Sequence, residues 1–168
     1  MATITTTASI VIDSCVWIDL ANGNVLEEAF CLPFKLIDAD VMQQEQIHPT
    51  NWPKLQKLGL ILMQASAHQI FDIVTIKNEN RGLSFYDASA LELAIRENCR
   101  LLTDDRYLIK IAGKYQVDVC GVTWLLNEMV HQSCLTGSAA LAALKRIDGS
   151  GHAISSHDLK FWTEHWSK

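Results

Sequence analysis

The sequence predicts an α/β protein, a three-layer α/β/α sandwich around a central, mainly parallel sheet. Short runs rich in Ile, Val and Leu alternate along the chain with longer segments whose apolar residues recur at helical spacing. This alternation is typical of parallel strands joined by helices that cover both faces of a sheet.

The length and composition fit one globular domain. A chain of 168 residues can bury one sizeable core but hardly two. Apolar residues make up 49% and charged residues 20% of the chain, as is ordinary for globular proteins. No apolar run approaches the roughly 18 residues that a membrane span needs. We expect a main domain over residues 1–136 and a helical extension over 137–168, packed on it or next to it.

The first half of the chain alternates short strands with helices. Ser9–Ile12 is rich in Ile and Val, Gly23 stops the helix that follows, and Pro33 ends the next one. In order, we expect a strand over 9–13, helices over 14–22 and 25–31, a strand over 35–41, a long helix over 52–67 and a β-branched run over 71–76.

The second half has a clearer pattern. Ala88, Leu91, Ala94 and Ile95 form one apolar stripe of an amphipathic helix. In order, we expect a helix over 84–98, a strand over 100–103, a helix over 105–115, a strand over 117–122, helices over 123–134 and 137–147, and a short helix within the last 17 residues.

Acidic residues stand where apolar runs end or helices begin, and we select four of them: Asp13, Glu45, Asp87 and Asp105. Ligands of open α/β sheets bind outside the carboxyl ends of the strands, so these side chains should converge on one crevice. Clustered carboxylates repel one another unless a cation joins them. Oxygen ligands suit Mg²⁺ or Mn²⁺, and the chemistry most often performed at such sites is phosphodiester hydrolysis.

Each of these acids also has a purely structural interpretation. Asp13 can cap the helix that follows it, and Ser84-x-x-Asp87 matches a capping box. Asp104 and Asp105 stand at the start of a helix, and stabilisation by the helix dipole alone can explain why acids occupy these positions. Because neighbouring side chains point in different directions, we expect Asp105 to face the site and Asp104 to lie outside it or in solvent.

The second of the four selected acids, Glu45, is not uniquely identified. Glu45 follows the strand expected over 35–41, but Asp38 and Asp40 lie within the same segment and are rivals for its role. Arg106 begins a basic stripe that recurs every fourth residue, and it is near enough to the acids to hold a substrate phosphate.

The charge balance excludes a role that depends on a basic surface. The formal net charge is −5 and the pI is about 5.6, which argues against a protein that coats DNA or RNA. A nuclease remains compatible, because catalytic acids lower the net charge and a bound metal restores positive potential locally.

The cysteines indicate free thiols. Five are present, with no C-x-x-C spacing, which favours buried thiols in a reducing cytoplasm over a disulfide framework. No Cys or His pair has the spacing of zinc ligands, and we assign no role to any of the six histidines.

Three segments resemble the PIN-domain family. They are Val11-Ile12-Asp13-Ser14-Cys15-Val16-Trp17-Ile18, the region from Leu83 to Ala94 followed by Leu101-Leu102-Thr103-Asp104-Asp105-Arg106, and Val119-Cys120-Gly121-Val122-Thr123-Trp124-Leu125-Leu126. The resemblance covers roughly residues 9 to 130.

The resemblance implies a Mg²⁺- or Mn²⁺-dependent ribonuclease that acts on single-stranded RNA, often as the toxin of a bacterial toxin–antitoxin pair. It implies Asp13, Asp87 and Asp105 as metal ligands and Glu45 as a further catalytic acid. It also implies that Thr103 helps to shape the site, a cytoplasmic location and a dimer. We expect substrate contacts from Ser14, Thr103 and Arg106, a homodimer, and a possible antitoxin partner.

Two alternatives remain. A phosphatase that uses Asp13 as its nucleophile usually carries a second acid two residues later, where this chain has Cys15. A catalytically silent PIN-like module that binds a protein or RNA would retain the acids without binding metal.

Overall fold

A computed structural model describes residues 8–44 and 51–167, and its centre is a five-stranded sheet. The strand order is β3-β2-β1-β4-β5, and every neighbouring pair is parallel. The strands are β1 (Ser9–Ile12), β2 (Lys35–Ala39), β3 (Ile61–Met63), β4 (Arg100–Leu102) and β5 (Val119–Cys120). The predicted α/β class with a parallel central sheet is confirmed.

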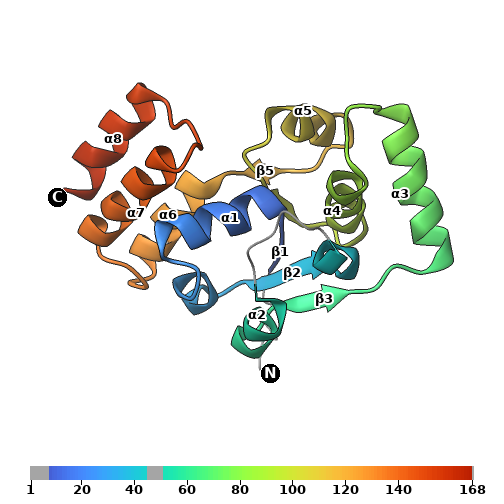
Figure 1. Ribbon diagram of the computed structural model, residues 1–168, viewed down its shortest axis with the longest axis horizontal. Coiled ribbons are helices and arrows are strands. Elements are labelled where there is room, and N and C mark those ends of the chain that lie inside the picture. Colours follow the sequence, from blue (N-terminus) through green and yellow to red (C-terminus); the bar gives the residue numbers. More distant parts are fainter. Residues whose placement is uncertain (1–7, 45–50, 168) are drawn as a thin grey trace, which may run out of the picture.

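Helices cover the sheet in two layers (Figure 1). The helical segments are α1 (Ser14–Gly23), η1 (Glu28–Cys31), η2 (Asp40–Gln44), α2 (Trp52–Leu58), α3 (Ala67–Glu79), α4 (Phe85–Arg96), α5 (Arg106–Lys114), α6 (Val122–His131), α7 (Gly137–Gly149) and α8 (Ser156–Trp166). Helix α4 packs on β1, β2 and β4, and α3 and α5 pack on α4. Helices α1, α6 and α7 pack on one another and form the second layer.

The central strand shows why the sequence folds this way. Ile10, Val11 and Ile12 of β1 are at most 2% exposed, since helices cover both faces of the strand. A strand buried on both sides has to be apolar at every position, and this explains the unbroken Ile-Val-Ile run.

The order of the strands creates a switch point beside β1. The chain moves from β1 to β2 and β3 in one direction across the sheet, whereas β4 and β5 lie on the other side of β1. Ile12 is in register with Leu102, so the carboxyl ends of β1 and β4 are neighbours. In open α/β sheets, a ligand crevice forms at such a point.

The predicted helix over 52–67 is wrong. Helix α2 ends at Leu58, because Gly59 adopts φ +122° and turns the chain, and Ile61–Met63 then pairs with β2 as strand β3. The β-branched run over 71–76 belongs to α3. Ser66 and Gln69 begin that helix with a capping box, in which each side chain bonds the other residue's backbone N–H.

The C-terminal helices pack on the rest of the fold. Helix α7 contacts α1 and α6, and α8 contacts α7. Figure 1 shows α7 and α8 at the end of the molecule opposite α3. Trp166 of α8 is 7% exposed, and its indole Nε1–H donates to Asn127 Oδ1 at 3.2 Å. Among the described helices, none is long and apolar enough to span a membrane.

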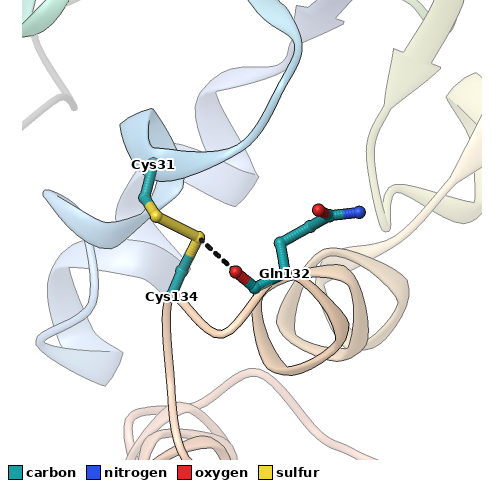
Figure 2. The surroundings of a disulfide bond; sticks show 3 residues. All are labelled: Cys31, Gln132 and Cys134. Carbon is teal, nitrogen blue, oxygen red and sulfur yellow. Dashed lines mark hydrogen bonds between the residues drawn. A yellow bond between two sulfur atoms is a disulfide. The ribbon is translucent and has the colours of Figure 1, made fainter.

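Two cysteines form a disulfide, so the expectation of free thiols is wrong for this pair. Cys31 at the end of η1 is bonded to Cys134, which follows α6, and their Cα atoms are 5.9 Å apart (Figure 2). The Cys134 sulfur lies 4.0 Å from the carbonyl oxygen of Gln132. Cys15, Cys99 and Cys120 are free thiols, each half-buried.

Candidate active site at the carboxyl ends of β1 and β4

Asp13 is the most deeply buried of the selected acids that the structure describes. It follows β1 directly, is 2% exposed, and its backbone N–H donates to the carbonyl of Leu102 at 2.9 Å. Its Oδ1 accepts the backbone N–H of Ser14 at 2.8 Å. Its Oδ2 accepts the hydroxyl of Thr103 at 2.8 Å and the thiol of Cys15 at 2.9 Å. The carboxylate is therefore held in one orientation by β1, α1 and the end of β4.

No cationic side chain is among the described groups that affect the pKa of Asp13. Burial raises the pKa of the Asp13 carboxyl, the three hydrogen bonds lower it, and the nearby charge of Asp87 raises it again. A carboxylate offers about four acceptor positions, and three are used here, so one stays open to a further ligand. A cation bound to this oxygen would favour the ionised form.

Asp87 lies in the first turn of α4 and acts as a helix cap. Its Oδ2 accepts the backbone N–H of Ser84 at 2.7 Å, and its own N–H donates to the Ser84 hydroxyl at 3.0 Å. This is the capping box that the sequence indicated. Its Oδ1 has no protein partner among the described residues. The same side chain also acts electrostatically on Asp13.

Thr103 connects Asp13 with Asp105. The Thr103 side chain is buried, donates to Asp13 and accepts the backbone N–H of Asp105 at 3.1 Å. Asp105 Oδ1 caps α5 by accepting the N–H of Leu108 at 2.7 Å, and Oδ2 has no partner within the described segments. Asp105 is exposed, and so is Arg106, which follows it. Both line a cavity of about 580 Å³ that also reaches Cys15.

Asp104 bonds a different element from Asp105, although both residues line the same cavity. Its Oδ2 accepts the backbone N–H of Val122 at 2.8 Å, at the start of α6. The residue is half-buried, so it does not lie in open solvent. Burial is the largest cause that raises the pKa of the Asp104 carboxyl.

The second acidic position is described only in part. Glu45 lies outside the described residues. Asp38 is buried in β2, where its carboxylate accepts the indole N–H of Trp17 at 2.9 Å and the backbone N–H of Ala39 at 2.8 Å. Asp40 is half-buried and begins η2, directly after β2.

The donor set fits a hard divalent cation. Asp13, Asp87 and Asp105 each use their carboxylate to fix local backbone, and each retains acceptor capacity. Oxygen ligands of this kind suit Mg²⁺ or Mn²⁺. Within the described segments, however, these three acids do not bring their oxygens within 4.8 Å of one another.

A tighter group involves residues that we did not select from the sequence. Asp19 of α1, Asp104 and His152 each place one ligand atom within 4.8 Å of the others, and such a group could hold a metal ion. An Asp between Ile18 and Leu20 on an apolar helix is the sequence signal that could have led to Asp19. For His152, which follows Gly151 in a polar turn, the sequence holds no comparable signal.

Comparison with known proteins identifies the family. Residues 9–166 match the PIN-domain family DUF3368. The chain belongs to the PIN-domain family. Members of this family are mostly metal-dependent nucleases. The match includes α7 and α8, so the C-terminal helices of this PIN-domain protein fall within the family pattern.

Two further comparisons add little to the family assignment. No curated protein matches the chain. Among solved structures, the chain is similar to the crystal structure of PAE2754 from Pyrobaculum aerophilum, at 15% identity and a TM-score of 0.47, over 79% of this chain and 96% of that one.

Proposed function

We propose that this PIN-domain protein is a metal-dependent endoribonuclease that hydrolyses phosphodiester bonds in single-stranded RNA. The observation that carries the proposal is the placement of Asp13 at the switch point, where Thr103 joins it to Asp105 and the charge of Asp87 reaches it. Ligands of open α/β sheets bind at this point.

The residues have distinct roles in this proposal. Asp13, Asp87 and Asp105 hold Mg²⁺ or Mn²⁺, and Glu45 supplies a further acid. The chemistry that such an ion supplies when bound is polarisation of the phosphodiester and activation of water. Ser14 and Thr103 orient the Asp13 carboxylate, by a backbone N–H and a hydroxyl.

In this proposal the RNA substrate contacts the surface next to these acids. The Arg106 guanidinium is exposed beside Asp105 and lines the same cavity, so it can pair with a phosphate of the RNA. Ser14 and Thr103 stand next to the same edge. An RNA strand laid across the carboxyl ends of β1 and β4 would bring a phosphodiester beside the acids.

The biological setting is part of the same proposal. We place the catalytic unit in residues 1–136 and the C-terminal extension in 137–168, and we expect a homodimer that an antitoxin protein controls. We expect a cytoplasmic location, where a reducing environment would open the Cys31–Cys134 bond. Light scattering of the purified protein, with and without reductant, tests the dimer.

A second candidate is a catalytically silent PIN module that binds an RNA or protein partner. The observation that favours it is the spacing of Asp13, Asp87 and Asp105, which do not form a ligand group within 4.8 Å in the described part of the chain. Such a module would bind its partner equally well with and without metal.

A cleavage assay separates the two candidates. End-labelled single-stranded RNA is incubated with the protein and Mn²⁺ or Mg²⁺, with EDTA and Asp13→Asn as controls. Metal-dependent cleavage by the wild type that Asp13→Asn loses supports the nuclease. RNA binding without cleavage in either metal favours the silent module.

A further inference from the structure

A second group of ligand atoms lies beside the strand-end acids. Asp19 comes from α1, Asp104 from the end of β4, and His152 from the segment between α7 and α8. One ligand atom of each lies within 4.8 Å of the other two, and His152 Nδ1 is 2.5 Å from Asp19 Oδ2. Residues 133 positions apart in the chain meet here, so the fold itself assembles the group.

Asp19 has an environment that calls for a cation. Its side chain is only 5% exposed, and within the described residues its carboxylate has no hydrogen-bond partner outside this group. A buried carboxylate without a cation is costly. The only positive charge that the described part of the chain offers it directly is a protonated His152.

One imidazolium does not balance two carboxylates. The Asp104 carboxylate faces the same group, so two carboxylates share one imidazole. A divalent cation bound to the neutral imidazole would balance the two carboxylates.

The group is accessible from solvent. Asp104 and His152 line the cavity of about 580 Å³ that also contains Asp105 and Arg106. An ion that enters this cavity would meet Asp104 and His152, whereas Asp19 does not line it.

We propose that Asp19, Asp104 and His152 form a second divalent-cation site, separate from Asp13 and Asp87. The imidazole nitrogen favours a transition metal such as Zn²⁺, Co²⁺ or Mn²⁺ over Mg²⁺, which prefers oxygen ligands. A metal bound here joins α1, β4 and the α7–α8 segment, so it fastens the C-terminal helices to the core. The site does not depend on the proposed RNA cleavage.

Co²⁺ binding tests the proposal, because Co²⁺ reports its ligands by visible absorption. Metal-free protein is titrated by calorimetry and spectroscopy as wild type, as the double variant Asp13→Asn/Asp87→Asn, and as this double variant with His152→Gln added. We expect the double variant to retain one Co²⁺ site, and His152→Gln to weaken that site at least about tenfold. The matched control is His157→Gln, since His157 is 88% exposed on α8 and should leave the affinity unchanged.

Several results would overturn the proposal. These are no Co²⁺ binding by the double variant, undiminished binding by His152→Gln, or sulfur-to-cobalt charge-transfer bands that reveal a cysteine ligand. Circular dichroism checks each fold. If His152→Gln does not fold, ¹⁵N spectra of the histidine rings of the double variant decide instead: Zn²⁺ should shift His152 and leave His157 in place. A failed RNA-cleavage assay would contradict only the proposed nuclease.

Discussion

At the residue scale, the strand-end acids combine two interpretations that the sequence presented as alternatives. Asp87 and Asp105 each cap a helix with one carboxylate oxygen and leave the other without a partner in the described segments. Asp13 binds the N–H of Ser14 and still retains acceptor capacity. A helix cap and a metal ligand are therefore compatible in one side chain.

Thr103 should be the most sensitive neutral residue of the site. Thr103→Val removes a donor to Asp13 and the acceptor of the Asp105 N–H, so it should cost about 1–3 kcal/mol of unfolding free energy. The Mn²⁺ concentration for half-maximal RNA cleavage should rise about tenfold. Thr103→Ser keeps the hydroxyl and should resemble the wild type in urea unfolding and in cleavage. Equal losses in both variants would contradict this account.

His152 should make stability depend on pH. The hydrogen bond to Asp19 is the largest cause that raises the pKa of His152, so the folded state favours its protonated form. This stabilisation is complete below about pH 6.5, the ordinary pKa of histidine, and is lost as the pH rises through the folded-state pKa. Urea unfolding in EDTA should show the loss in wild type and in His157→Gln. His152→Gln should show a flatter profile, and an unchanged profile would refute the pairing.

At the element scale, boundaries and strand assignment were the hardest to predict. An edge strand of three residues, Ile61–Met63, has too few positions to show a period of two. Leu55, Leu58 and Leu62 also have the spacing of one helix face, which favours a single helix. Pairing with β2 decides its conformation, and a single sequence does not reveal that pairing. The Ser66-x-x-Gln69 pattern is a capping box that marks the start of α3 in the sequence, and the expectation of one helix over 52–67 does not take it into account.

Variants of the two residues that cap α4, Ser84 and Asp87, distinguish a structural role from a catalytic one. Ser84→Ala removes the acceptor of the Asp87 N–H and should cost about 1 kcal/mol of unfolding free energy, with RNA cleavage retained. Asp87→Asn keeps an oxygen for the Ser84 N–H and should cost less than about 1 kcal/mol, but it should abolish Mn²⁺-dependent cleavage. Thermal unfolding and single-turnover cleavage measure both effects. A folded Asp87→Asn protein that still cleaves RNA with Mn²⁺ would show that this acid serves only as a cap.

At the scale of the whole molecule, the parallel sheet explains how much of the site was predictable. Asp13 and Thr103 follow two strands, so the alternation of strands and helices was enough to place them at one edge. The Asp19 group is different, since it joins three segments whose proximity only the packing of α7 on α1 determines. The Cys31–Cys134 bond was missed for the same reason, because it joins distant segments with no local motif.

The disulfide should contribute substantially to stability. It joins residues 103 positions apart in the sequence, and the loss of chain entropy on crosslinking such a loop is worth up to about 4.7 kcal/mol. Reduction should lower the unfolding free energy, measured in urea with and without dithiothreitol. Cys31→Ser/Cys134→Ser should be insensitive to dithiothreitol, because it lacks this bond and the other three cysteines are free thiols in the described structure. Equal stability of the oxidised and reduced wild type would contradict the prediction.

The location of bound manganese tests the central claim most directly. Crystals grown with Mn²⁺ would be examined for anomalous scattering at the manganese edge, in the wild type and in Asp13→Asn. The account predicts a peak within bonding distance of the Asp13 and Asp87 carboxylates that disappears in Asp13→Asn. A wild-type map without density at Asp13, even with a peak at the Asp19 group, would contradict it.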